Sequence, residues 1–199
     1  MWAGDRLSVA AQLTVPIASV LIVWIGLHAH LATLSDAGQR RACRRRALVA
    51  LLIYYLVILS VLLFFGGLFH LDREWGGPVN LRPFYSIRRF WIHYRRTGSR
   101  SSLRNLVGNA FLLFPMGVLL PVLYRKLRRP WYMIPLMAAV SAGIESLQWR
   151  TGLGVADVDD CILNFAGAIA GYVITMLCIG AAALVSRLRR HGKREEGGR

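Results

Sequence analysis

Apolar stretches alternate with charged connections along this chain, and they set its predicted architecture. Five such stretches, at residues 7–28, 47–69, 105–124, 130–149 and 161–186, approach or exceed the length of about 20 residues that a helix needs to cross a bilayer. They follow one another with little intervening polar sequence, so no separate soluble domain is expected. We predict an all-α fold, a polytopic helical membrane protein with about five transmembrane helices.

The same pattern divides the chain into three parts. Residues 1–46 are expected to hold the first transmembrane helix and a basic loop, and residues 47–186 a single membrane domain. The arginine-rich tail at 187–199 is expected to be disordered. The first apolar stretch is too long for a cleavable signal peptide and lacks a basic leader, so we expect this helix to stay in the protein.

The distribution of charge supports a membrane protein and argues against nucleic-acid binding, and the cysteine spacing argues against a disulfide framework or a zinc site. The net charge is +15 at pH 7, which in a soluble protein would suggest nucleic-acid binding. Here most basic residues lie in short clusters between apolar stretches, as orientation signals do, so no nucleic-acid partner is expected. The three cysteines have no paired spacing, so neither an obligatory disulfide nor a zinc site is predicted.

The loop charges also predict the orientation. Residues 35–46, 124–130 and 186–199 are net positive, whereas residues 150–160 are net negative. Positive loops remain in the cytoplasm, which places the N-terminus outside and the C-terminus inside.

The connection at residues 72–102 does not follow the rule that positive loops remain in the cytoplasm. It is rich in arginine, yet the order of the five predicted spans places it on the outer side of the membrane. Its apolar residues recur at spacings of three and four: Phe84, Ile87, Phe90, Trp91 and Tyr94. This pattern predicts an amphipathic helix at the membrane surface, with the bilayer as its partner. A solvated arginine loop is the plainer alternative.

Polar side chains interrupt three of the predicted helices at a similar depth, in the outer half. They are Asn105 and Asn109 in the third helix, Glu145 and Gln148 in the fourth, and Asp157, Asp160 and Asn164 around the start of the fifth. Spacings of three and four place each set on one helix face. Such groups are unfavourable in lipid, so we expect them to turn towards one another.

Three chemistries fit this oxygen-rich set. Glu145, Asp160 and Asp157 are candidate catalytic residues, because a buried carboxyl group can act as a general acid or base. The same three carboxylates are candidate ligands for a divalent cation such as Mg²⁺ or Ca²⁺. Alternatively, they pair with Arg82 or Arg150 as a structural lock. The sequence does not rank the first two, and for each amide alone interhelical hydrogen bonding is the plainer explanation.

Small residues and one proline complete the pattern. Gly108, Gly143, Gly167 and Gly171 would let helices approach closely. Pro115 leaves a carbonyl in the third helix without its usual donor and predicts a kink there.

Four ordered segments resemble the VanZ-like family of bacterial membrane proteins, named for an accessory teicoplanin-resistance protein. The segments are 80–84 (NLRPF), 105–120 (NLVGNAFLLFPMGVLL), 141–148 (SAGIESLQ) and 157–172 (DVDDCILNFAGAIAGY). The resemblance covers roughly residues 48–174. Family members often carry an arginine where Leu153 stands here, so that contact is in doubt. The resemblance implies a bacterial plasma membrane protein with a role in the cell envelope and lowered teicoplanin susceptibility, without a settled activity.

Two hypotheses follow. In the first, the protein binds or modifies an anionic lipid or a lipid-linked envelope precursor at the outer face. Arg82 would contact a phosphate, and Asn105, Asn109, Gln148 and Asn164 would orient the substrate. In the second, the protein is a non-catalytic scaffold that masks a glycopeptide target or docks envelope machinery. A transporter is less favoured, since no inverted repeat is apparent. Whether the protein is an enzyme stays open.

Overall fold

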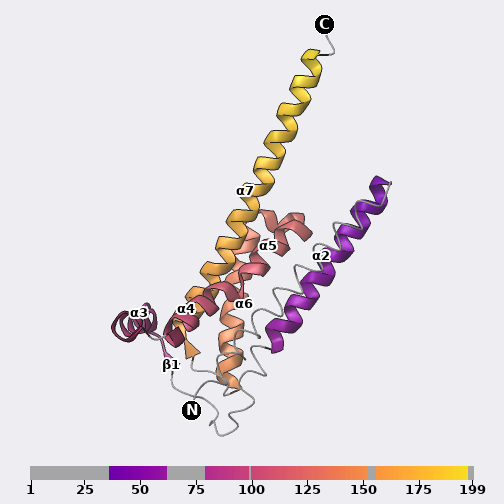
Figure 1. Cartoon of the computed structure of the whole chain (residues 1–199). Coiled ribbons are helices and arrows are strands. Elements are labelled where there is room, and N and C mark those ends of the chain that lie inside the picture. The colour runs from indigo at the N-terminus through magenta and orange to yellow at the C-terminus, as the bar shows by residue number, and fades with distance from the viewer. Residues whose placement is uncertain (1–35, 62–78, 99, 152–155, 197–199) are drawn as a thin grey trace, which may run out of the picture. The chain divides into compact units, whose positions relative to one another are not determined.

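The computed structural model describes residues 36–61, 79–98, 100–151 and 156–196, which are almost entirely helical (Figure 1). The chain divides into two compact units, Met1–Leu62 and Leu63–Arg199, and each is described by itself. The predicted first span at residues 7–28 lies outside the described residues. The helical fold class is confirmed.

The first unit contributes one described helix, α2 (Ala37–Ser60). Asp36 caps it, because its Oδ2 accepts a hydrogen bond from the Gln39 N–H at 2.9 Å, and this bond lowers the pKa of Asp36. The basic residues that we expected in a loop therefore form the first turns of the helix, since arginine is a good helix former. The second predicted span is helical as far as it is described.

The third predicted span is two helices, α4 (Arg100–Leu112) and α5 (Phe114–Leu123). The helical pattern breaks at Leu113, two residues before Pro115. Pro115 lacks an N–H and cannot donate to the carbonyl four residues earlier, so the interruption lies where the sequence predicts a kink. The Leu113 side chain is fully buried at this break.

The fourth and fifth predicted spans are continuous helices. α6 (Pro130–Arg150) follows a short 3₁₀ helix, η2 (Arg125–Arg128), and α7 (Val158–Glu196) is the longest helix. α7 includes residues 187–196 of the tail, which we expected to be disordered. Arginine, lysine and glutamate in this segment all favour a helix, which explains the continuation.

The arginine-rich connection contains a helix, α3 (Tyr85–Thr97), as its spacing predicts. Two short strands depart from the purely helical prediction. β1 (Val79–Asn80) pairs in parallel with β2 (Ala156–Asp157), with Val79 opposite Ala156 and Asn80 opposite Asp157. This pair joins the segment before α3 to the start of α7.

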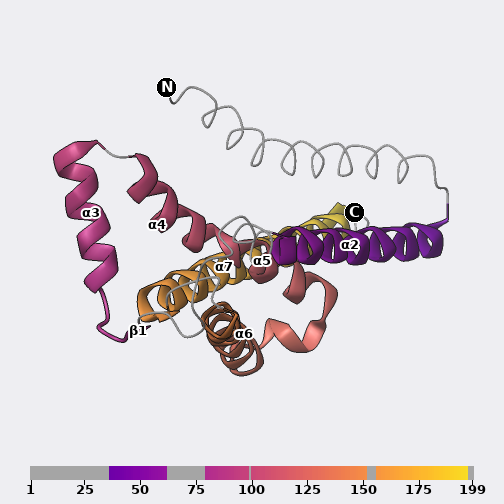
Figure 2. The ribbon, with the colours of Figure 1, turned by 90° about the horizontal axis from the view of Figure 1, so that it is seen from below.

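α7 is the centre of the second unit and packs against α4, α5 and α6. Figure 2 shows α4 and α6 on either side of it. Three glycines permit the close packing, because a Cβ at Gly117, Gly167 or Gly171 would overlap a backbone carbonyl of the facing helix. Met133, Met137 and Ala168 are fully buried and form part of the core.

Two helical stretches within the described residues are long and apolar enough to cross a bilayer, Leu106–Leu123 and Val158–Arg189. The first includes the break at Leu113. The remaining predicted spans and the orientation stay predictions. The C-terminal half of α7 extends beyond α5 and η2 (Figure 1), and most of its side chains are exposed as far as residue 189.

Candidate functional site

Asp159 connects α7 to the start of α3. Its side chain is fully buried, and its Oδ1 accepts a hydrogen bond from the Phe84 N–H at 2.5 Å. Its Oδ2 accepts two more, from the N–H groups of Ser86 at 2.7 Å and Ile87 at 3.1 Å. The first N–H groups of a helix have no partner within it, and a carboxylate satisfies both their hydrogen bonds and their partial positive charge. Asp159 therefore caps α3 from another helix.

The residue before α3 has an unusual backbone conformation that this cap helps to hold. Phe84 has a φ of 63°, in the left-handed region that bulky residues rarely adopt. Its side chain is exposed, so packing of the ring does not account for the conformation. The hydrogen bond from its N–H to Asp159 fixes the turn and so sets the direction in which α3 leaves.

Asp157 forms a second connection, to β1 and α3. Its Oδ1 accepts a hydrogen bond from Asn80 Nδ2 at 3.1 Å and another from the Asp159 N–H at 3.0 Å. Its Oδ2 accepts a short hydrogen bond from the Ser86 hydroxyl, which in turn accepts one from Asn80 Nδ2 at 3.1 Å. Both Asp157 oxygens thus have donors. Among the candidate catalytic residues, Asp157 is the one most completely engaged in holding the fold.

Glu145 of α6 contacts the backbone of Asp157 at the start of α7. Its Oε1 accepts a hydrogen bond from the Asp157 N–H at 2.8 Å, and the residue is only 9% exposed. One turn earlier, the buried Ser141 hydroxyl donates to the Cys161 carbonyl at 2.7 Å. The face of α6 that carries Ser141 and Glu145 therefore lies against the start of α7. Gln148 is half-buried.

Asp160 and Asn164 continue the site along α7. The Asp160 side chain is hydrogen-bonded to that of Asn109 on α4, and its charge lies within electrostatic range of Glu145. Asn164, one turn further on, is 2% exposed, and its Oδ1 has no hydrogen-bond partner among the described residues. The structure thus brings together four of the predicted site residues, Asn109, Glu145, Asp157 and Asp160, with Asn164 on the next turn.

The other two predicted site residues are placed differently. Arg82 is exposed, and its N–H donates to Asn80 Oδ1 at 3.2 Å. Its guanidinium group is outside the buried network, so a phosphate contact stays a prediction. Asn105 lies on α4, one turn before Asn109, and its side chain is outside the described set.

Three residues of this network are not among the predicted site residues: Asn80, Ser86 and Asp159. Asn80 and Asp159 lie in segments that the motifs include, but nothing in a single sequence links them. Asp159 and Phe84 are 75 residues apart. Ser86, near the start of a predicted amphipathic helix, carries the only local signal, since hydroxyl side chains are common at helix starts.

The carboxylates do not make an evident metal centre. Across the described ranges, no group of three or more His, Cys, Asp or Glu side chains is arranged to hold a metal ion. Asp157 and Asp159 already accept hydrogen bonds through both oxygens. Glu145 and Asp160 retain the freest oxygens and are therefore the two groups best suited to exchange a proton or bind a ligand. A role for Mg²⁺ or Ca²⁺ stays a prediction.

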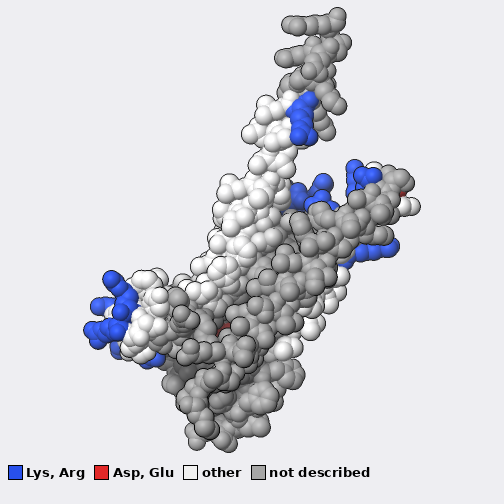
Figure 3. All heavy atoms as spheres, in the orientation of Figure 1, with Lys and Arg blue, Asp and Glu red and all other residues white. Residues whose placement is uncertain are grey.

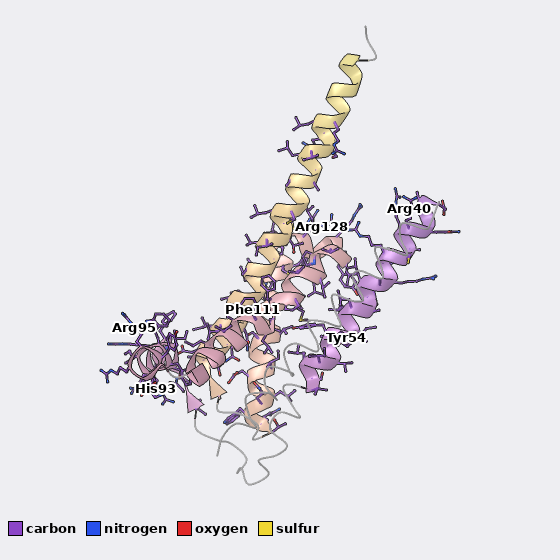
Figure 4. All side chains as sticks on the ribbon, in the orientation of Figure 1. Arg40, Tyr54, His93, Arg95, Phe111 and Arg128 are labelled. Atoms are coloured by element: carbon purple, nitrogen blue, oxygen red, sulfur yellow. The ribbon has the colours of Figure 1, made fainter. Side chains whose placement is uncertain are left out.

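α3 carries a dense cationic surface next to this acidic network. Its arginines are exposed: Arg88, Arg89, Arg95 and Arg96. Figure 3 shows basic side chains gathered on α3, and Figure 4 labels Arg95 and His93 on this helix. Trp91 is 49% exposed and its ring centroid lies 6.0 Å from that of Tyr94. Arginines interleaved with exposed aromatic rings are typical of a helix at a lipid headgroup layer.

Comparison with known proteins adds a family. The family model described as VanZ/LLP1 matches residues 51–179, and all four motif segments lie within the match. No curated protein and no solved structure matches the chain.

Proposed function

The chain belongs to the VanZ/LLP1 family, and from that premise we propose that it binds or modifies an anionic lipid or lipid-linked precursor of the bacterial cell envelope. Family membership and the two apolar helices together indicate a membrane protein. In our proposal this membrane is the bacterial plasma membrane, the site faces outward, and the activity lowers teicoplanin susceptibility.

One observation carries the proposal. The start of α3 is bonded to Asp159, and the next residue along α7, Asp160, is half-buried in one group with Asn109 and the buried Glu145. A cationic, aromatic helix is thus fixed beside carboxylates that retain free oxygens. Arginine is well suited to hold phosphate oxygens, and polar groups inside a membrane domain are candidates for function by default.

Each group then has a role in the proposal. Arg88 and Arg89, on the first turns of α3, bind the phosphate together with Arg82. Glu145 and Asp160 face the reacting or recognised part of the headgroup and would transfer a proton if the protein is catalytic. The amides orient the ligand: Asn105, Asn109, Gln148 and Asn164. Asp157 and Asp159 position α3 and do not contact the ligand.

Lipid binding by the purified full-length chain tests this proposal. The protein is titrated in nanodiscs with a fluorescent phosphatidylglycerol and with the matching phosphatidylcholine. The double variant Arg88→Gln/Arg89→Gln is expected to bind phosphatidylglycerol about tenfold more weakly, because charge-assisted phosphate contacts are lost. The matched control Arg44→Gln/Arg45→Gln removes two exposed charges from α2 and should bind as the wild type does. Equal binding by both variants contradicts the proposal.

A non-catalytic scaffold is the second candidate, and one observation favours it. Two of the four clustered carboxylates, Asp157 and Asp159, are fully occupied by hydrogen bonds that hold α3 and β1. A site built mainly to position a surface helix suits a protein that masks a target or docks envelope machinery. Turnover of a purified phospholipid, abolished by Glu145→Gln in a folded protein, would rule this candidate out.

A further inference from the structure

We propose that the headgroup bound here carries a primary ammonium group, which is held between Glu145, Asp160 and Asn164. The ligand would then be an aminophospholipid or another lipid-linked aminophosphate, with its phosphate on the α3 arginines. This inference rests on the function proposed above and narrows the ligand of the same site: the phosphate is the anionic group of that proposal, and the amine makes the headgroup zwitterionic.

The charge balance around Glu145 and Asp160 favours a bound cation. Each carboxylate has one hydrogen bond to a described neighbour, Glu145 from the Asp157 N–H and Asp160 from Asn109. No arginine, lysine or histidine in the described segments forms an ion pair with either. Glu145 is buried and Asp160 is half-buried. Two such carboxylates within electrostatic range of each other and without a cation are unfavourable, and a bound cation would relieve this.

The unpartnered side-chain oxygen of Asn164 also favours a bound hydrogen-bond donor. Asp160, Asn164 and Gly167 follow one stripe of α7, at spacings of four and three. Both ends of the stripe face α4, since Asp160 is bonded to Asn109 and a Cβ at Gly167 would overlap the Ala110 carbonyl. Asn164 therefore faces the same interface, about 6 Å along the helix from Asp160. A buried acceptor without a donor is rare and indicates that one is missing.

The donor inventory of an ammonium group fits these acceptors. A primary ammonium has three N–H donors and no acceptor, so it can serve Glu145, Asp160 and Asn164 together. A divalent cation fits less well. Mg²⁺ and Ca²⁺ take six or more oxygen ligands, whereas the Asp157 and Asp159 oxygens already accept hydrogen bonds.

The position of α3 supplies the other half of a zwitterionic headgroup. Asp159 holds the N–H groups of Ser86 and Ile87, and Arg88 and Arg89 follow directly. Asp160 follows Asp159 on α7. The arginines of α3 and the Asp160 carboxylate therefore both lie next to the contact between Asp159 and α3. A ligand with a phosphate and an amine a few bonds apart requires cationic and anionic groups that are close together in this way.

An N-methylation series of phospholipids tests the inference. The purified full-length chain is titrated by native mass spectrometry with dioleoyl phosphatidylethanolamine, its monomethyl and dimethyl derivatives, and phosphatidylcholine. The wild type should bind phosphatidylethanolamine about tenfold more tightly than phosphatidylcholine, with intermediate affinities between, because each methyl group removes one N–H donor. Equal affinity across the series in the wild type overturns the inference, and this comparison needs no variant to fold.

Variants then locate the site. Glu145→Gln and Asn164→Leu should each remove the difference in affinity between phosphatidylethanolamine and phosphatidylcholine. Asp36→Asn, the same acid-to-amide change at an exposed helix cap, should leave that difference unchanged. If both site variants still bind phosphatidylethanolamine about tenfold more tightly than phosphatidylcholine, the inference is also overturned.

The result separates this inference from the proposed function. If phosphatidylglycerol and phosphatidylethanolamine bind equally and both weaken in Arg88→Gln/Arg89→Gln, the phosphate site stands and the ammonium site falls. If the arginine variant binds all phospholipids as the wild type does, the proposed phosphate site fails, and the methylation series still decides the ammonium site.

Discussion

At the scale of single residues, the carboxylates around the start of α7 have distinct surroundings despite being adjacent in sequence. Asp159 accepts three backbone N–H groups, Asp157 accepts bonds from Asn80 and Ser86, and Asp160 is bonded to Asn109. Their side chains diverge because β2 ends at Asp157 and the helix begins immediately after it. A run of adjacent acids thus separates into two that hold other elements through both oxygens, Asp157 and Asp159, and one with fewer hydrogen bonds, Asp160.

Asp159→Asn should loosen α3 without unfolding the bundle. The amide places an NH₂ group against backbone donors and removes the charge, a loss of about 2 kcal/mol for bonds to a charged acceptor. Hydrogen exchange of the Ser86 and Ile87 amides should accelerate about thirtyfold as a result. Asp36→Asn is the matched control and should leave these two amides unchanged. Equal exchange in the wild type and Asp159→Asn would show that this carboxylate does not hold α3.

At the scale of elements, the bundle depends on glycines at helix crossings. A Cβ at Gly167 would overlap the Ala110 carbonyl, and one at Gly117 would overlap that of Ala168. These neighbours are backbone atoms and cannot rotate away. By contrast, a Cβ at Gly143 or Gly180 would meet nothing within 4 Å. The same residue type therefore has a packing role at some positions and none at others.

This contrast gives a sharp prediction. Gly167→Ala should destabilise the protein by about 1 to 3 kcal/mol through overpacking, whereas Gly143→Ala should be neutral or slightly stabilising because alanine favours helices. Thermal unfolding of the purified variants in one detergent measures both. A Gly167→Ala midpoint equal to that of Gly143→Ala would refute the close crossing of α4 and α7.

The sequence predicted most of the helices, but it did not predict two helix bounds, the strand pair or the cap on α3. Apolar length located α6 and α7, and the spacing of Phe84, Ile87, Trp91 and Tyr94 predicted α3, since each is a local property. Two helix bounds were misjudged, because arginine-rich ends at residues 39–46 and 187–196 read as loop or tail although their composition favours helix. The β1–β2 pair and the Asp159 cap join segments far apart in sequence, and a single sequence holds no signal for such contacts.

At the scale of the molecule, α3 and η2 lie at opposite ends of the packed part of α7. α3 is bonded to Asp159, whereas the Arg128 carbonyl beside η2 accepts a hydrogen bond from the Tyr172 hydroxyl at 2.7 Å. Asp159 and Tyr172 are separated by about 20 Å along the helix, comparable with much of the hydrocarbon thickness. In the predicted topology these two arginine-rich segments lie at opposite membrane surfaces, so the charge rule alone cannot place both in the cytoplasm.

Cysteine accessibility tests this orientation. In a chain whose native cysteines are replaced by alanine, a cysteine at the exposed His93 should react with an impermeant maleimide added to intact cells. A cysteine at the exposed Lys126 should react only after permeabilisation. The reverse pattern would invert the predicted topology and place α3 in the cytoplasm.

We propose that the two carboxylates beside α3, Glu145 and Asp160, carry an envelope function. The most direct measurement is teicoplanin susceptibility of a sensitive Gram-positive host that expresses the wild type, Glu145→Gln, Asp160→Asn or the control Asp36→Asn at matched membrane levels. We expect reduced susceptibility with the wild type and Asp36→Asn, and its loss with Glu145→Gln and Asp160→Asn. Susceptibility that is the same for all four chains would contradict the claim.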